Sequence, residues 1–196
     1  MAGAAALVLV LIGGVVTLIT ADTAEDADLS QTGLHEPTAQ IHLHQKAKQG
    51  DAQAQFDLGR AHWKNAEYPQ AFPWFKAAAE RGHIEAEYML GMAYLSGRGT
   101  LQNYRAALDQ FIQAAKHGHL EAEYRLGLLY RDGLATPPDK ETAYLWLNIA
   151  AARGHEEALQ YRDKLADVMS AEEIDRAQEA STQAHAKLIE TLAGKP

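Results

Sequence analysis

Hydrophobic and polar positions between residues 50 and 154 recur in one order, which indicates a chain built from repeats. Three ten-residue segments align without gaps, and they begin at Gly50, Gly82 and Gly118. Gly82 follows Gly50 by 32 residues. Gly118 follows Gly82 by 36 residues, and Gly154 follows Gly118 by 36. A period of this length is typical of stacked structural units that each contain two helices.

Each repeat contains two segments in which apolar residues return at helical spacing. In the middle repeat, the first segment places Ala86, Leu90 and Tyr94 at i, i+4 and i+8. The second segment has small or aromatic residues at i, i+4, i+7 and i+8, namely Ala107, Phe111, Ala114 and Ala115. Both spacings lie on one face of a helix. We therefore predict an all-α chain in which the two helices of each repeat bury these faces.

The pattern continues in altered form at both ends of the repeats. Residues 37–49 match a second helix that has no first helix before it, and residues 155–167 match a first helix imperfectly. A Ser-x-x-Glu capping box at Ser170 begins a last helix, which runs to about Leu192. Stacked repeats need such polar-faced ends. The predicted solenoid therefore spans residues 37–193 and closes with a C-terminal capping helix.

Residues 2–21 form a separate apolar stretch without a charged side chain. A helix of about 20 residues spans roughly the 30 Å of a bilayer's hydrocarbon core. Residues 1–21 are therefore predicted to be a transmembrane anchor or a cleaved signal peptide. We favour the retained anchor, because the stretch lacks a basic start and the best cleavage position, after Ala21, has the bulky Ile19 two residues before Ala21.

Residues 22–36 are acidic, and the first Lys or Arg after the apolar stretch is Lys46. This composition predicts a flexible linker between the anchor and the solenoid. Since Lys and Arg mark the cytoplasmic side of a membrane segment, their absence favours export of the solenoid. We expect a single-pass inner-membrane protein with the solenoid in the periplasm. The alternative is a secreted or periplasmic protein after signal cleavage.

Charge and composition narrow the range of ligands. The chain carries 18 Lys and Arg against 26 Asp and Glu, a net charge of -8, and has no run of basic residues. Nucleic acid is therefore not an expected partner, because phosphate binding depends on a cationic surface. The chain has no cysteine, which excludes disulfides, thiolate catalysis and iron–sulfur clusters.

The nine histidines are not expected to form a metal site. His42 and His44 are two residues apart, so that a helix points their side chains about 200° apart. His83, His119 and His155 occur once per repeat, on helices about 8–10 Å apart, which is too far for all three to bind one ion. We expect these three to be turn residues beside the repeated glycines, and we expect no metal and no cofactor.

No arrangement of side chains typical of a hydrolase occurs in the sequence. The Ser-x-x-Lys, Gly-x-Ser-x-Gly and His-Glu-x-x-His motifs, which place a nucleophile or a metal beside its activating base, are absent. Glu85 with Glu87, and Glu121 with Glu123, are pairs at i and i+2, which a helix places on different faces. We expect these carboxylates to be solvated or to line a groove. No catalytic residues and no enzymatic activity are predicted.

The repeats resemble those of the Sel-one-like repeat (SLR) family, which are related to tetratricopeptide repeats. The middle repeat carries a Leu-Gly-x-x-Tyr core at residues 90–94, a Gly-Arg-Gly loop at 97–99 and an alanine pair at 114–115. The third repeat keeps Leu-Gly at 126–127, whereas the first repeat lacks the glycine loop and is four residues shorter. The resemblance covers about residues 37–166 and implies a right-handed α-solenoid of helix-turn-helix repeats.

In related solenoids, the first helices line a concave groove that receives peptides or partner helices. The resemblance therefore implies an interaction scaffold or adaptor, at or across the membrane, whose partners are proteins. The candidate groove residues lie on the first helices, opposite the buried stripe, and are Asp57, Arg60, Lys64, Glu85, Met89, Met92, Glu121, Arg125 and Leu128. The apolar members would supply adaptable contact, and the charges would select among partners. The alternative is that the apolar members only pack against neighbouring repeats.

Two other functions stay open as alternatives. Some disulfide-rich relatives are described as binding penicillin or hydrolysing β-lactams, but this chain lacks their cysteines and an acylation motif. A β-lactam or peptidoglycan-related hydrolase is therefore the weaker alternative. A scaffold for a polysaccharide secretion complex is suggested by Trp63, Trp74 and Trp146. Trp74 and Trp146 are equivalent positions of second helices, which favours a packing role for both.

Overall fold

The computed structural model describes residues 11–12, 15–16 and 35–193, and the chain divides into two units, Met1–Ile41 and His42–Pro196. In the first unit, β1 (Leu11–Ile12) pairs antiparallel with β2 (Val15–Val16). These four residues fall in the stretch predicted to be an anchor or signal. The rest of that stretch, and residues 22–34 of the predicted linker, lie outside the described residues. None of the helices in the described ranges has the length and hydrophobicity that crossing a bilayer requires.

From His35 to Ala193 the described chain is helical, with short turns between helices. The helices are α1 (His35–Lys48), α2 (Ala52–Lys64), α3 (Tyr68–Ala79), α4 (Ile84–Ser96), α5 (Tyr104–Lys116), α6 (Leu120–Asp132), α7 (Lys140–Ala152), α8 (Glu156–Ala166) and α9 (Ala171–Ala193). The last two residues of the predicted linker, 35 and 36, thus belong to α1.

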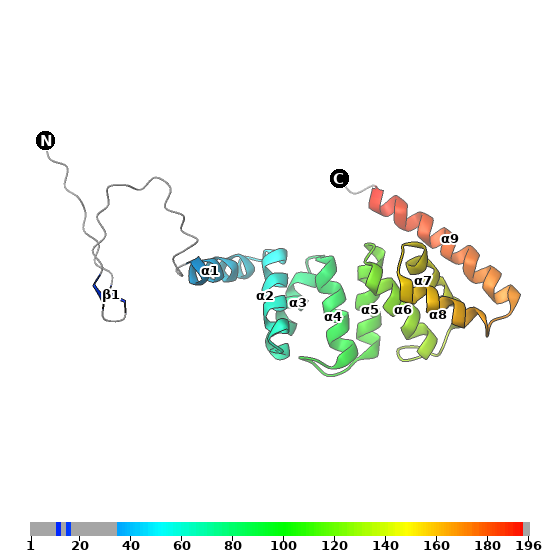
Figure 1. The fold of residues 1–196 in the computed structure, drawn as a ribbon, viewed down its shortest axis with the longest axis horizontal. Helices are drawn as coiled ribbons and strands as arrows, with labels where there is room; N and C mark the ends of the chain where they lie inside the picture. Colours follow the sequence, from blue (N-terminus) through cyan, green and yellow to red (C-terminus); the bar gives the residue numbers. More distant parts are fainter. Residues whose placement is uncertain (1–10, 13–14, 17–34, 194–196) are drawn as a thin grey trace. The chain divides into compact units, whose positions relative to one another are not determined.

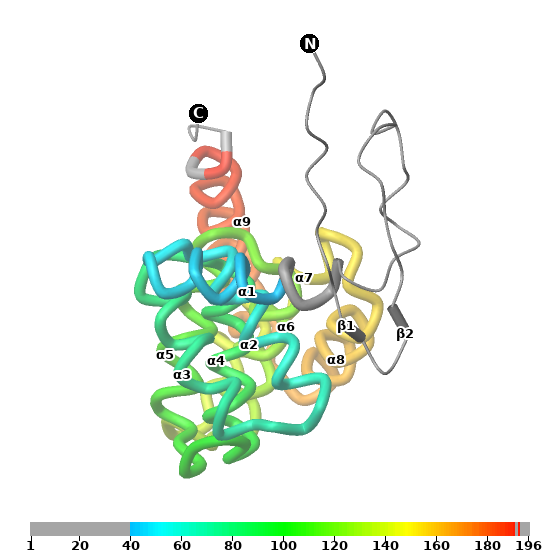
Figure 2. Tube along the Cα trace, turned by 90° about the vertical axis from the view of Figure 1, so that its left-hand side faces the viewer, coloured from blue at the N-terminus to red at the C-terminus, as the bar shows by residue number. Residues whose placement is uncertain are grey.

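Successive helices of the second unit pack side by side in chain order. Contacts run from α2 through each helix to α8, and α9 packs on α7. Figure 1 shows this row of helices, and Figure 2 shows the same helices turned by 90°. The first helices of the repeats are α2, α4, α6 and α8, and the second helices are α3, α5, α7 and α9. The predicted all-α repeat architecture is confirmed for the described residues of this unit.

Glycines on the first helices let the second helix of the same repeat approach closely. A Cβ atom at Gly59 would lie 2.6 Å from a ring carbon of Phe75, and one at Gly91 would lie 2.6 Å from a ring carbon of Phe111. Both rings are completely buried. Since carbon atoms without a bond between them do not approach this closely, any larger residue would push the two helices apart. Gly127 faces Leu147 in the third repeat in the same way.

The ends of the repeat stack follow the predictions closely. Ala47, in the part of α1 that belongs to the second unit, is buried with Ala54 and Leu58 of α2, so that α1 takes the place of a second helix. At the other end, the backbone N–H of Ser170 donates to the Glu173 carboxylate at 2.7 Å, and the N–H of Glu173 donates to the Ser170 hydroxyl at 3.3 Å. This reciprocal pair is the predicted capping box before α9.

Two details of the turns are also settled. Gly97 ends α4 in the left-handed conformation, with φ of 68°, so the Gly-Arg-Gly segment is a turn, as expected. α3 begins at Tyr68 and continues through Pro73. Pro69 occupies the first turn of α3, where a missing N–H costs nothing.

His83, His119 and His155 each stand directly before a first helix and cap its first turn. Their Nδ1 atoms accept hydrogen bonds of 3.2 Å from the backbone N–H groups of Ala86, Ala122 and Ala158. An Nδ1 atom that accepts a hydrogen bond carries no proton, so the proton of each neutral ring sits on Nε2. The expectation that these histidines are turn residues is confirmed, with the added role of helix caps.

The other side of each histidine ring contacts the preceding repeat. Nε2 lies 3.1 Å from the Gln53 side chain for His83, 3.1 Å from Glu85 for His119, and 3.0 Å from Glu121 for His155. The rings also lie against Phe56, Tyr88 and Tyr124, at centroid distances of 4.5, 4.4 and 4.3 Å. One side chain per repeat therefore caps a helix, meets an acceptor and covers an aromatic ring. We call this set of contacts the histidine interlock.

The interlock is incomplete at the two ends of the stack. Asp51 caps α2, with its Oδ1 atom 2.8 Å from the N–H of Ala54, and the helix before it is the second helix α1. Gln160 of α8 stands at the repeat position of Phe56, Tyr88 and Tyr124. A polar side chain thus replaces the aromatic ring where no further repeat follows in the described chain.

Comparing alanine and asparagine at position 119 should separate the capping role of His119 from its contact with the preceding repeat. His119→Ala is expected to lower the free energy of unfolding by about 2–3 kcal/mol, because it removes a helix cap and a hydrogen bond to Glu85. His119→Asn, which keeps a capping acceptor, should lose only about 1 kcal/mol. Urea denaturation followed by circular dichroism measures both. His42→Ala, at an exposed histidine of α1, is the control, and equal losses for the two His119 variants would contradict the capping role.

Candidate functional site

Two columns of side chains run along the exposed face of the first helices, one residue per repeat. The first column contains Asp57, Met89 and Arg125, and the second contains Arg60, Met92 and Leu128. Arg60 is exposed and the other five are partly exposed. Within one helix the two columns are three residues apart, so that they lie on one face. We call them the variable columns, because their chemistry changes from repeat to repeat.

The charged side chains of these columns form ion pairs within their own helices. The Arg60 guanidinium lies 3.1 Å from the Asp57 carboxylate, and Arg125 lies 2.8 Å from Glu121. Both pairs are three or four residues apart on one helix and partly exposed, where such pairs contribute only a few tenths of a kcal/mol. Lys64 is exposed near the end of α2.

Glu85 and Glu121 have a different position from the other candidates. Glu85 is the acceptor for His119, and Glu121 is the acceptor for His155. Both carboxylates therefore belong to the histidine interlock, at the edge of the first-helix face. The sequence analysis grouped them with the groove, because the spacing along one helix does not reveal that the histidine of the next repeat contacts them.

Met89, Met92 and Leu128 are partly buried, and each packs against a different hydrophobic cluster. Met89 packs beside Phe56 and Leu90, whereas Met92 contacts the cluster around Phe111. Leu128 contacts the cluster shared by α6, α7, α8 and α9. Each side chain thus contributes to packing and leaves part of its surface accessible, so packing and partner contact are compatible at these positions.

Arg125 sits at the point where two repeats meet. Its guanidinium carbon lies 5.4 Å from the centre of the Tyr124 ring, and its Nε atom is buried without a hydrogen-bond partner among the described residues. Burial, together with the charge of Glu121, raises the pKa of the neighbouring Tyr88 hydroxyl, which Arg125 partly offsets. A cation held against aromatic rings can also contact an acidic partner group.

A third set of polar residues, buried inside the stack, was missed by the sequence analysis. Gln55, Glu87 and Glu123 occupy one repeat position and are 5%, 6% and 0% exposed. The expectation that Glu87 and Glu123 are solvated or line a groove was therefore wrong. The sequence did contain a sign of this buried position: a polar residue directly follows the buried alanine in every repeat, after Ala54, Ala86 and Ala122.

Each buried polar residue except Gln55 meets a basic side chain from the end of the second helix that follows. His117 Nδ1 lies 3.4 Å from Glu87, and Arg153 donates from Nη1 to Glu123. Arg153 also donates from Nη2 to the backbone carbonyl of Gly118 at 2.8 Å. Gln55 instead donates to the carbonyl of Ala47 at 3.0 Å. These contacts tie first helices to the turns around them.

Burial makes Glu123 a weak acid. Its Oε2 atom has no hydrogen-bond partner in the described part of the chain, and loss of solvation raises the pKa of the carboxyl to about 7, although Arg153 and His155 oppose the shift. A buried ion pair of this kind contributes little net stability, but removing one partner is costly.

The Sel1 repeat family model matches residues 52–83, 84–119 and 120–155, which together make up more than half of the chain. The chain belongs to the Sel1 repeat family. The first two matched segments end on His83 and His119, and the third ends on His155, so each Sel1 repeat in this chain finishes with an interlock histidine.

Two solved structures show the same fold. A crystal structure of c5321, a protective antigen present in uropathogenic Escherichia coli strains and displaying an SLR fold, is 28% identical over 81% of this chain, with a TM-score of 0.74. This chain spans 35% of the length of c5321. A Sel1 repeat protein from Oxalobacter formigenes is 31% identical over 63% of this chain and 96% of its own, with a TM-score of 0.57. No curated protein matches the sequence.

Membership in the family defines the general class of function. Sel1 repeat proteins generally serve as protein-interaction scaffolds, and the fold is typically non-catalytic. In the Sel1 repeats of this chain, Trp74 and Trp146 are partly buried and pack against hydrophobic clusters, as the packing interpretation expected, and Trp63 does the same. Within the described residues, no three His, Cys, Asp or Glu side chains are grouped so that they could hold a metal ion.

The Sel1 stack should lose stability as the Glu123 carboxyl ionises. The folded-state pKa of about 7 lies above the ordinary value of 4.5, so the stabilising protonated form is fully present below about pH 4.5 and is lost as pH rises through 7. Relative to Glu123→Gln, the natural chain should lose up to about 3 kcal/mol between pH 4.5 and pH 8.

Urea denaturation of the natural chain and the Glu123→Gln variant at several pH values measures this difference. Glu141→Gln is the matched control, because Glu141 pairs with Arg176 at the surface and its pKa is lowered by that hydrogen bond. A constant difference between the natural chain and Glu123→Gln from pH 4.5 to pH 8 would show that Glu123 is ionised throughout.

Proposed function

We propose that this protein is a scaffold that binds a partner protein on its first-helix face, through the variable columns. The observation that supports the proposal is that some repeat positions stay the same from repeat to repeat while others change. Residues that hold the stack together are the same or similar in every repeat, as with the glycines that face Phe75, Phe111 and Leu147. The neighbouring variable columns lie on the same helices and change in charge and polarity.

The chemistry of the variable columns suggests the partner's general character. The middle repeat contributes Met89 and Met92, and the third repeat adds Leu128 and Arg125. Flexible methionines adapt to the shape of an apolar side chain, and a neighbouring arginine favours an acidic one. A peptide or helix with an apolar anchor beside an acidic residue fits this surface.

Residues 2–21 would hold the scaffold at a membrane. Support for this part of the proposal comes from the sequence, where the stretch is uncharged and long enough to span a bilayer. With the acidic residues 22–36 as linker, the solenoid would work in the periplasm of a cell with an inner membrane. A tether of this kind raises the concentration of the scaffold near membrane complexes without any new contact.

Substituting the variable columns should reduce partner capture. In-cell cross-linking followed by mass spectrometry is expected to recover a partner with the natural chain. With Met89, Met92 and Arg125 all changed to alanine, the yield should fall at least about tenfold, because a few central side chains carry most of an interface's binding energy.

The control carries Asp109→Ala and Gln113→Ala, at two exposed positions of α5. Thermal unfolding of both variants checks that the stack stays folded. Capture of the same partners at the same yield by the triple variant would exclude this face as the binding surface.

Deleting residues 2–21 should release the protein from the membrane. The full chain is expected to sediment with membranes and to resist extraction at high pH, whereas the deleted chain should remain in the soluble fraction. Sequencing the amino terminus of the mature protein distinguishes the alternative. A mature chain that starts near Asp22 would mean a cleaved signal and no tether.

A further inference from the structure

Each turn that leads from a second helix into the next first helix carries two basic side chains, two positions apart. In chain order, these pairs are Arg81 and His83, His117 and His119, and Arg153 and His155. The first helix before each turn has two polar residues at the same spacing, which are Gln53 and Gln55, Glu85 and Glu87, and Glu121 and Glu123. We call each turn, together with the first helix before it, a junction.

The three junctions differ in how their charge depends on pH. The first junction has glutamines at both helix positions, and these carry no charge. The third has Arg153, whose guanidinium does not lose its proton in a protein. The middle junction has histidines at both turn positions and glutamates at both helix positions. Because histidine changes its charge between about pH 5 and pH 8, only the middle junction of the three can lose both positive charges near neutrality.

The contact between His117 and Glu87 is the clearest pH-dependent contact of the middle junction. The Nδ1 atom of His117 lies 3.4 Å from a carboxylate oxygen of Glu87. Glu87 is 6% exposed, whereas His117 is only partly buried. A buried carboxylate needs a compensating positive charge, and His117 supplies that charge only while both ring nitrogens are protonated.

The other charged and titratable groups around His117 come from both sides of the turn. Those that line a cavity together with His117 are His83, Glu85, His119, Lys116 and Lys187. The lysines oppose a positive charge on the His117 ring, and Glu85 favours it. Glu87 is the charged group in direct contact with the ring, so its effect exceeds that of side chains that only share a cavity with it.

His119, in the same junction, responds to pH in two opposing ways. A second proton would strengthen its contact with Glu85, but it would occupy the Nδ1 atom that caps α6. His117 caps no helix through its ring, since its Nδ1 atom points at Glu87. A second proton on His117 therefore strengthens the junction without breaking another hydrogen bond of that nitrogen.

We propose that the middle junction is a pH-sensitive hinge, in which protonated His117 locks α4 to the turn between α5 and α6 and releases it as pH rises above neutrality. A basic group that gains an acidic partner on folding stabilises the fold while it is protonated, and this contribution is lost as pH rises. The variable columns cross the junction between Met92 and Leu128. Opening of the hinge would separate these two residues, a consequence for partner binding that rests on the proposed function.

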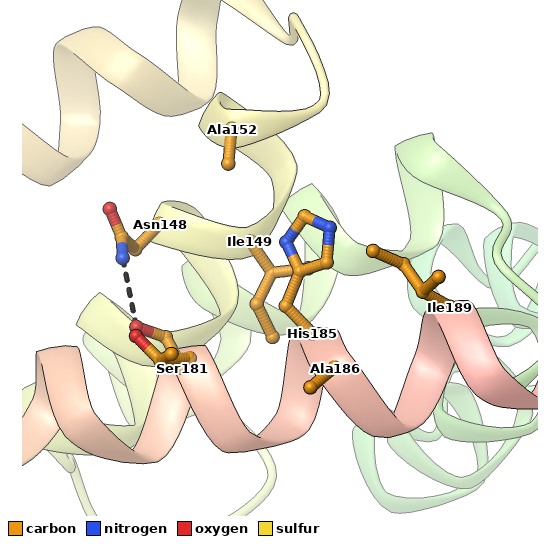
Figure 3. A pocket seen from close by; sticks show the side chains of 8 residues that line it. Asn148, Ile149, Ala152, Ser181, His185, Ala186 and Ile189 are labelled. Atoms are coloured by element: carbon orange, nitrogen blue, oxygen red, sulfur yellow. Dashed lines mark hydrogen bonds between the residues drawn. The ribbon is translucent and has the colours of Figure 1, made fainter.

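His185 of α9 provides a matched control for the loss of an imidazole. Figure 3 shows its ring in a cavity between α7 and α9, which Asn148 and Ser181 also line. None of the eight residues that line this cavity is acidic. His185→Gln therefore removes a histidine ring that has no carboxylate in its cavity.

Hydrogen exchange of the full chain at pH 5.5 and pH 8, measured by mass spectrometry and corrected for intrinsic exchange rates, tests the proposal. At pH 5.5, residues 113–126 should be at least about tenfold more protected in the natural chain than in His117→Gln, since a hydrogen bond to a charged group contributes about 1.5–3 kcal/mol. At pH 8 the difference should fall below about threefold, because a neutral imidazole and an amide donate similarly. His119 and Glu123 are present in both chains, so their own pH dependence cancels in the comparison.

Three further variants identify the source of this difference. His117→Arg copies the third junction and should keep high protection at both pH values. In a Glu87→Gln chain, adding His117→Gln should change the protection by less than about threefold at either pH, because the partner is already absent. His185→Gln should match the natural chain at residues 113–126 at both pH values. Circular dichroism verifies that every variant is folded, and if His117→Arg is not, the glutamine variants decide.

Two outcomes would overturn the hinge. One is a difference between the natural chain and His117→Gln that is absent at pH 5.5 or equally large at pH 8. The other is the same difference in the Glu87→Gln background or in His185→Gln. Since the exchange experiment contains no partner protein, its result is independent of whether the first-helix face binds one.

Discussion

The stack depends on the way one histidine ring uses both of its nitrogens and its face. Nδ1 accepts from the first turn of a helix, and Nε2 and the ring plane contact the repeat before it. A serine or aspartate would cap the helix equally well, but it would be too short to reach the preceding repeat and has no ring to cover Tyr88. The histidine therefore sets the start of each first helix and the position of that helix on its neighbour with a single side chain.

Within a repeat, the corresponding constraint is the glycine of the first helix, which has no side chain. Gly91 lets the Phe111 ring reach the backbone of α4, and the small residues around it complete a cluster that extends into the next repeat. Because each cluster joins consecutive helices, the hydrophobic core runs along the stack and each repeat is stabilised mainly by its neighbours. This explains why the ends need modified units, such as α1 and α9.

Stacking uses most positions of the first helices, and this limits where a partner can bind. The glycine and alanine faces meet second helices, the interlock occupies one edge, and Glu87 and Glu123 are buried in a polar column. The variable columns are among the positions that this arrangement leaves accessible.

The sequence by itself determined the helix pairs, their register and the capping box, because these depend on residues at fixed short spacings. It also placed His119 correctly beside its turn. Only the tertiary structure decided that Glu123 is buried against Arg153, that Glu121 forms a hydrogen bond with His155, and that Leu192 of α9 lies beside Gly118. In each case the contacting residues are 30 or more positions apart, and helical periodicity specifies a face without specifying which distant side chain covers it.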